Sequence, residues 1–160
     1  MNEKDIVEKL QKISTKMKQL NKKFKLLSLL RSAKEEYDKN QFEDCIKNCE
    51  EALKTDPNNS IALRGLGCSM QSLGEFEKAK DYYKKALEFS KNKEIEYTLL
   101  GTIFYLENNL ENALKYYNLA IDYNEDYDLA YEGKNQTMLE RHLQIADLQE
   151  LLITQEFKKN

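Results

Sequence analysis

The chain has 160 residues, of which 33% are charged, and a formal net charge of −3. We therefore expect one domain or one compact array with a real apolar core. The chain has only one proline and five glycines, so residues that end strands and form long loops are scarce. This composition favours helix nearly throughout. The longest apolar run is far short of the roughly 20 residues that span a bilayer. No secretory signal is visible in the first residues, so we expect a cytoplasmic protein.

Residues 1–25 form a segment with its own pattern. Large apolar residues recur there at alternating spacings of four and three, which is typical of a coiled-coil seam. They are Ile6, Leu10, Ile13, Met17, Leu20 and Phe24, and Leu27 continues the series. Eight lysines against three acidic residues give the segment a net charge of +5. The pattern predicts a basic amphipathic helix that can run on into the following residues, because no glycine or proline occurs before Pro57.

Three roles for this helix are compatible with the pattern. It packs against the rest of the chain, forms a coiled coil with another copy or a partner, or lies on an anionic membrane. The membrane is disfavoured because Phe24 is the only aromatic residue in the segment. Nucleic acid is disfavoured because the lysines lack interleaved arginines and aromatics and the whole chain is acidic.

A second pattern recurs with a period of 34 residues. Leu73–Glu88 reads LGEFEKAKDYYKKALE and Glu107–Asp122 reads ENNLENALKYYNLAID, while Lys39–Lys54 is a weaker copy, KNQFEDCIKNCEEALK. Apolar positions in each copy are three and four residues apart, the period of a helix face. A turn residue, Gly74 or Asn108, falls in the middle of each unit. Each unit is therefore predicted to be helix, tight turn, helix.

Small and bulky residues alternate at equivalent positions of the two strong copies. The small ones are predicted to let two antiparallel helices approach closely, and the tyrosines to fill the gap toward the next pair. The small residues are Gly67, Ala79, Gly101 and Ala113, and the tyrosines are Tyr83 and Tyr117. Since neither pair can bury its outer face alone, the units must stack.

The period, the Leu-Gly step at Leu66-Gly67 and the Ala-x-x-x-Tyr step from Ala79 to Tyr83 together resemble the tetratricopeptide repeat family. The resemblance implies an all-α, right-handed α-solenoid of three units, at residues 26–59, 60–93 and 94–127. The first is an atypical terminal unit, in which Cys45 and Cys49 replace the alanine and the aromatic residue of the second helix.

Beyond the third unit a fourth copy begins and then fails. Tyr131 matches Tyr97, but Lys134-Asn135 replaces the Leu-Gly step and no turn follows. Residues 128–160 are therefore predicted to form a long capping helix. Its far end, Leu148–Ile153, is apolar on more than one face, and we expect something to cover it.

No catalytic or metal constellation is evident in the sequence. Cys45 and Cys49 lie one helical turn apart, but the sole histidine, His142, is some ninety residues away, so we interpret both as packing thiols. The odd third cysteine, Cys68, argues against a disulfide framework. No Ser-His-Asp series and no phosphate loop can be assembled. We predict that the chain is not an enzyme and has no cofactor or metal.

The resemblance also implies a concave groove, lined by the first helices of successive units, that takes peptides. Tyr37 and Tyr105 are the best candidates for partner contact, since tyrosine offers large contact area at low entropic cost. The full set of predicted groove residues is Lys34, Tyr37, Arg64, Cys68, Gln71, Thr98, Thr102, Tyr105 and Leu139.

One subtype of the family can be compared position by position. Its co-chaperones clamp the acidic tail of heat-shock chaperones with lysine, arginine and asparagine, but only a lysine survives here. The clamp positions hold Leu30, Lys34, Gly65, Ile95 and Leu99. An extended or helical segment with apolar anchors is a better ligand for this lining.

The predicted function is non-enzymatic protein binding, as an adaptor or scaffold. Two alternatives remain open from the sequence. The first is a self-assembling structural protein that uses its end helices. The second is a chaperone similar in plan to the bacterial chaperones for type III translocators.

Overall fold

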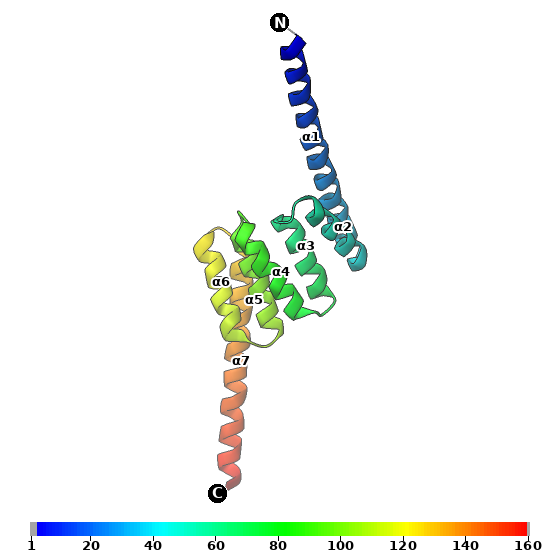
Figure 1. The fold of residues 1–160 in the computed structure, drawn as a ribbon. Coiled ribbons are helices and arrows are strands. Elements are labelled where there is room, and N and C mark those ends of the chain that lie inside the picture. The colour runs from blue at the N-terminus through cyan, green and yellow to red at the C-terminus, as the bar shows by residue number, and fades with distance from the viewer. Residues whose placement is uncertain (1–2, 160) are drawn as a thin grey trace. The chain divides into compact units, whose positions relative to one another are not determined.

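The computed structural model describes residues 3–159, with side chains for residues 4–155. This part of the chain is all-α, with seven helices, of which the first six form three sequential pairs (Figure 1). The helices are α1 (Glu3–Asp38), α2 (Phe42–Thr55), α3 (Ser60–Ser72), α4 (Phe76–Phe89), α5 (Lys93–Leu106), α6 (Leu110–Tyr123) and α7 (Asp128–Lys159). They form two compact units, one ending at Phe89 and the other beginning at Ser90.

In the first unit, α2 packs against both α1 and α3, and α3 packs against α4. Small side chains fill much of the core between α1, α2 and α3. Its buried members are Ala33, Cys45, Cys49, Ala52, Ala62 and Leu66. Half-buried leucines of α1, such as Leu26 and Leu29, pack against this core. The two cysteines are thus packing residues, as the sequence indicated.

In the second unit, α6 packs against both α5 and α7, and α5 also contacts α7. The buried residues of these helices include Leu100, Ile103, Leu110, Ala113, Tyr117, Ala120 and Ala130. Phe104 of α5 and Tyr116 of α6 stack their rings, with centroids 5.2 Å apart.

The same turn closes all three helix pairs. Asn40, Gly74 and Asn108, each 34 residues from the next, have positive φ values of 62°, 79° and 59°. In each turn, the backbone N–H of the following residue donates to a carbonyl five residues back, as in Glu75 to Met70 at 2.8 Å. This is the hydrogen bond of a Schellman motif, which glycine and asparagine tolerate best. The predicted helix, tight turn, helix plan is confirmed, and the first pair shares it.

The repeated spacing of glycine and tyrosine places a tyrosine ring against a glycine inside two of these helix pairs. A Cβ placed on Gly67 of α3 would lie 2.4 Å from the ring of Tyr83 of α4, and one on Gly101 would lie 2.9 Å from the ring of Tyr117. The glycines therefore make room for a tyrosine ring, whereas the sequence suggested that they let two backbones meet. Tyr117 also fits against Gly133 of α7, which is the predicted contact toward the next helix.

The two terminal helices are long and partly uncovered. α1 runs without a break from the basic segment into the first helix pair, and α7 is one continuous helix, as predicted. The far end of α7 exposes Leu148, Leu151 and Leu152 by 54–61%, so the described residues of its own unit leave this end uncovered. Within the described residues, the structure holds no helix with the length and apolarity needed to cross a bilayer.

Candidate partner-binding groove

α1 and α3 are the first helices of the first two helix pairs. They line a cavity of about 280 Å³ whose floor comes from α2. Leu30 and Ile61 form its apolar walls, and Lys34, Arg64 and Tyr37 add polar atoms. The remaining lining residues are Ala33, Cys45, Cys49, Gly65 and Cys68. Four of the nine groove residues predicted from the sequence are therefore gathered in one place: Lys34, Tyr37, Arg64 and Cys68.

The cavity exists because small residues occupy the positions where larger ones would close it. Ala33 and Gly65 face it from α1 and α3. A Cβ on Gly65 would lie 2.6 Å from Sγ of Cys49, so a larger side chain there would collide with the floor. Ile61 remains 56% exposed, which leaves the cavity open on one side.

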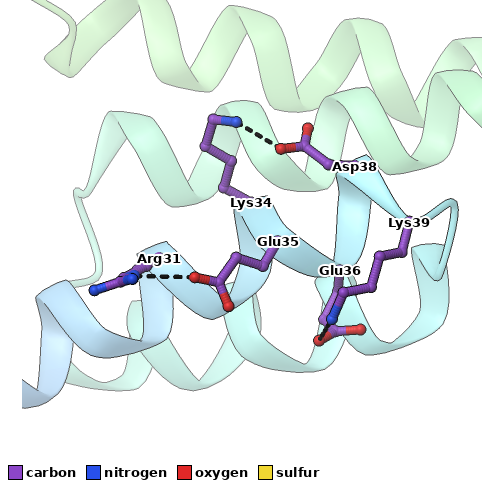
Figure 2. Close-up of polar contacts among 6 residues, drawn as sticks. All are labelled: Arg31, Lys34, Glu35, Glu36, Asp38 and Lys39. Carbon is purple, nitrogen blue, oxygen red and sulfur yellow. Dashed lines mark hydrogen bonds and ion pairs between the residues drawn. The ribbon is translucent and has the colours of Figure 1, made fainter.

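The charges along the last turns of α1 are already paired with one another (Figure 2). Nζ of Lys34 lies 2.6 Å from Oδ2 of Asp38, and Nε of Arg31 lies 2.9 Å from Oε1 of Glu35. The hydrogen bond and the charge of Asp38 both raise the pKa of Lys34. Such exposed pairs contribute little to stability, so a partner carboxylate can exchange with Asp38. Lys34 alone nevertheless does not make a strong anion site.

Tyr37 is held at the edge of the cavity by contacts at both ends of its side chain. Its ring packs against Phe42 with centroids 5.5 Å apart, and its hydroxyl lies 3.1 Å from Oγ of Ser72. The ring is half-buried, so one part of it remains available for contact. A side chain positioned in this way loses little rotamer freedom on binding.

Two predicted groove residues of α3, Cys68 and Gln71, contact the buried side chain of Tyr83. The Tyr83 hydroxyl donates to Oε1 of Gln71 at 2.8 Å and contacts Sγ of Cys68 at 3.5 Å. In the next helix pair Thr102 occupies the position equivalent to Cys68, and its Oγ1 lies 3.2 Å from the hydroxyl of Tyr117. Sequence spacing could have revealed this link, because positions 68 and 102 stand 15 residues before their tyrosines.

The second unit presents the other predicted residues on α5 and α7. Thr98 is buried, and its carbonyl accepts a hydrogen bond from Thr102 at 3.0 Å. Tyr105 is half-buried on α5, and Leu139 is 54% exposed on α7. Their contact with a partner stays a prediction.

Cys49, which lines the cavity, is a poor nucleophile. Burial, together with the neighbouring Cys45, raises the pKa of the Cys49 thiol to about 12, so the nucleophilic thiolate is scarce at neutral pH. None of the three cysteines is in a disulfide. Among the side chains of residues 4–155, no three His, Cys, Asp or Glu residues are grouped so that they could hold a metal ion.

The buried Tyr83 hydroxyl should give the protein a measurable alkaline pH dependence. Burial raises the pKa of Tyr83 above its ordinary value of 10, so the folded state keeps the proton that the unfolded state releases. This contribution to stability is complete below about pH 10 and declines above it, by about 1.4 kcal/mol per pH unit.

Tyr83→Phe tests this dependence. At neutral pH the variant should be about 0.5–1.5 kcal/mol less stable because the hydrogen bond to Gln71 is lost. Between about pH 9 and about pH 11 the difference should close, because phenylalanine does not ionise. Urea unfolding of both proteins across this range measures it. A constant difference at every pH would contradict the assignment.

Comparison with known proteins identifies the repeats. Residues 60–93 and residues 97–127 match two family models, each described as a tetratricopeptide repeat. The chain contains two tetratricopeptide repeats. The first helix pair lies outside these two matches, but its turn and its packing are consistent with a third repeat unit.

Solved tetratricopeptide repeat domains have a similar fold. The Sgt2 domain from Aspergillus fumigatus is 18% identical, covering 76% of this chain and 81% of that one, with a TM-score of 0.67. The first such domain of Spaghetti (RPAP3), bound to the HSP90 peptide SRMEEVD, is 16% identical, covering 74% and 94%, with a TM-score of 0.66.

A larger protein contains the same fold as one part. A mutant O-GlcNAc transferase from Thermobaculum terrenum is 20% identical over 73% of this chain, with a TM-score of 0.68. The match spans only 22% of the transferase. At such identities the likeness shows the fold alone. No curated protein matches this chain in sequence.

Proposed function

We propose that the chain is a non-enzymatic protein-binding module, an adaptor or scaffold, that captures a partner segment on the face formed by α1 and α3. The observation that carries this proposal is the cavity of about 280 Å³ between α1, α2 and α3. It is somewhat smaller than the roughly 300–1,000 Å³ pockets that hold small molecules. It suits a single large apolar side chain of a protein partner.

The lining indicates how the segment is held. An apolar anchor buried against Leu30 and Ile61 contributes about 1.5–3 kcal/mol, and the ring of Tyr37 extends the contact. The guanidinium of Arg64 has five donors and can serve a partner carbonyl in addition to its own contacts. On the second unit, taken by itself, we propose Thr102, Tyr105 and Leu139 as partner contacts. We also propose that the protein acts in the cytoplasm.

This proposal separates the chain from domains that clamp acidic tails. Lys34 is the one cation among the clamp positions, because the others hold Leu30, Gly65, Ile95 and Leu99. We therefore expect the peptide SRMEEVD to bind weakly, if at all, to the full chain in calorimetry. The opposite result would be micromolar binding of this peptide that is lost in Lys34→Ala. It would show that the chain recognises its partner through a carboxylate clamp and not through an apolar anchor.

Ile61→Glu tests the apolar anchor directly. The side chain lines the cavity and is 56% exposed, so the change introduces a charge at the mouth at little cost to folding. Partners are captured with the full chain and identified by mass spectrometry, and the affinity of the bound segment is measured. Loss of an anchor worth about 1.5–3 kcal/mol corresponds to a weakening of tenfold or more.

Leu73→Glu is the matched control. Leu73 is 44% exposed at the end of α3 and does not line the cavity, so its variant carries the same added charge. It should keep the partner segment with near wild-type affinity. Equal loss in both variants, or no loss in Ile61→Glu, would refute the cavity as the capture site.

A further inference from the structure

The first part of α1 displays an apolar stripe that its own unit leaves uncovered. Seven residues from Ile6 to Leu27 keep 42–61% of their surface exposed, over roughly 32 Å of helix at 1.5 Å per residue. They are Ile6, Leu10, Ile13, Met17, Leu20, Phe24 and Leu27. Figure 1 shows this part of α1, in blue, extending beyond α2 and α3 of the same unit.

The stripe has the width of a coiled-coil seam. Its spacings of four and three place Leu10, Met17 and Phe24 at one core position of the heptad and Ile13, Leu20 and Leu27 at the other. Between Leu10 and Leu27 the exposed apolar residues occupy only these two positions, which makes the stripe narrower than the apolar face of a helix that lies on a larger surface. The occupant that fits it is another helix, and a lipid bilayer fits it poorly.

Lysines line one flank of this seam. Lys9, Lys16 and Lys23 are seven residues apart and directly precede the apolar residues Leu10, Met17 and Phe24. The other flank is neutral, with Ser14 and Asn21. No acidic residue occurs between Lys9 and Lys34, so α1 itself supplies no compensating charge along the flank of Lys16 and Lys23.

These flanks argue against a second copy of the same helix as the occupant. In a parallel pair the lysine flank of one helix faces the neutral flank of the other, so no ion pair forms. In an antiparallel pair the two lysine flanks face each other, and like charges repel. A helix whose own flank carries Asp or Glu gains an ion pair with each lysine, in addition to burying the stripe.

We propose that residues 6–27 of α1 form a two-stranded coiled coil with a helix of a partner protein whose apolar seam is flanked by acidic residues. The site is separate from the cavity between α1, α2 and α3. It gives the adaptor a second binding surface with its own specificity, because the flanking charges select the partner and the stripe supplies the affinity.

Two designed peptides of four heptads probe this surface. Both have leucine at the core positions, and one carries glutamate at the flanking positions while the other carries lysine there. The full chain should bind the glutamate peptide and not the lysine peptide, as measured by fluorescence anisotropy. The double variant Lys16→Glu/Lys23→Glu should bind the glutamate peptide roughly tenfold more weakly and gain affinity for the lysine peptide.

The matched control is Lys18→Glu/Lys22→Glu, which makes the same charge change on the face away from the stripe. It should keep the glutamate peptide within about twofold. Ile61→Glu should also keep it, so failure here and failure at the cavity are distinguishable. The proposal is overturned if the glutamate peptide does not bind or if both double variants lose it equally. Two further results would overturn it, each seen without binding of the peptide. One is sedimentation of the chain with phosphatidylserine vesicles, and the other is self-association of the chain through the stripe.

Discussion

Replacing Tyr83 with alanine is expected to remove about 3–5 kcal/mol from the free energy of unfolding. The side chain is completely buried, and its ring fills the space that Gly67 leaves on the facing helix. The variant also loses the hydrogen bond to Gln71. Urea unfolding followed by circular dichroism measures the change, with the first unit expected to unfold before the second.

Tyr82→Ala is the matched control for this loss. Tyr82 precedes Tyr83 on α4 but is only half-buried, and its ring has Nζ of Lys85 5.6 Å from its centroid. Its removal should cost less than half as much as that of Tyr83. If the two variants were equally destabilised, the packing of Tyr83 against Gly67 would not be the main contact between α3 and α4.

Gly133→Ala is expected to have the second largest effect, in the other unit. The added Cβ would lie 2.4 Å from two ring carbons of Tyr117, so α7 has to move away from α6. Overpacking of this kind costs about 1–3 kcal/mol. After the roughly 1 kcal/mol that alanine gains over glycine in a helix, we expect a net loss of up to about 2 kcal/mol. Thermal melting of the full chain should shift downward accordingly.

Asn135→Ala shows the propensity effect without the clash. Asn135 lies on the exposed side of α7, two residues further along. Its replacement should leave the melting temperature unchanged or raise it slightly. A Gly133→Ala protein that melts above the wild type would show that Tyr117 and α7 are not in tight contact.

The fold follows from the sequence because its signals agree at several positions. The 34-residue period, the turn residues and the helical spacing of apolar residues all predict the same helix pairs. The weak first copy illustrates how this works. Its core residues depart from the pattern, yet Asn40 occupies the same left-handed turn as Gly74 and Asn108. The turn residue of the first copy therefore still follows the repeat pattern, although the core residues of this copy do not.

The cavity could be predicted only in part. The sequence placed Tyr37 and Arg64 on a common face, but the space between them depends on how Ala33, Gly65 and Cys49 meet across three helices. Such packing is not encoded in the spacing of any one helix. The pairing of Lys34 with Asp38 was readable in principle, since the two stand four residues apart on a helix.

The long terminal helices show the same limit. Periodicity predicted the stripe on α1, but it could not tell whether the stripe packs against the chain itself or faces a partner. The exposure of residues such as Leu10 and Phe24, at 60% and 61%, is a property of the folded unit. The lysine spacing then becomes informative, because it describes what an uncovered seam requires of its occupant.

Hydrogen exchange of the full chain, alone and bound to its captured partner segment, tests the central claim most directly. Binding at the cavity should slow exchange in two stretches that face each other in the first unit, residues 34–38 of α1 and residues 61–68 of α3. The middle of α6, in the second unit, should stay unchanged as an internal reference. Protection confined to the outer helices α2 and α4, with none at these two stretches, would contradict the account.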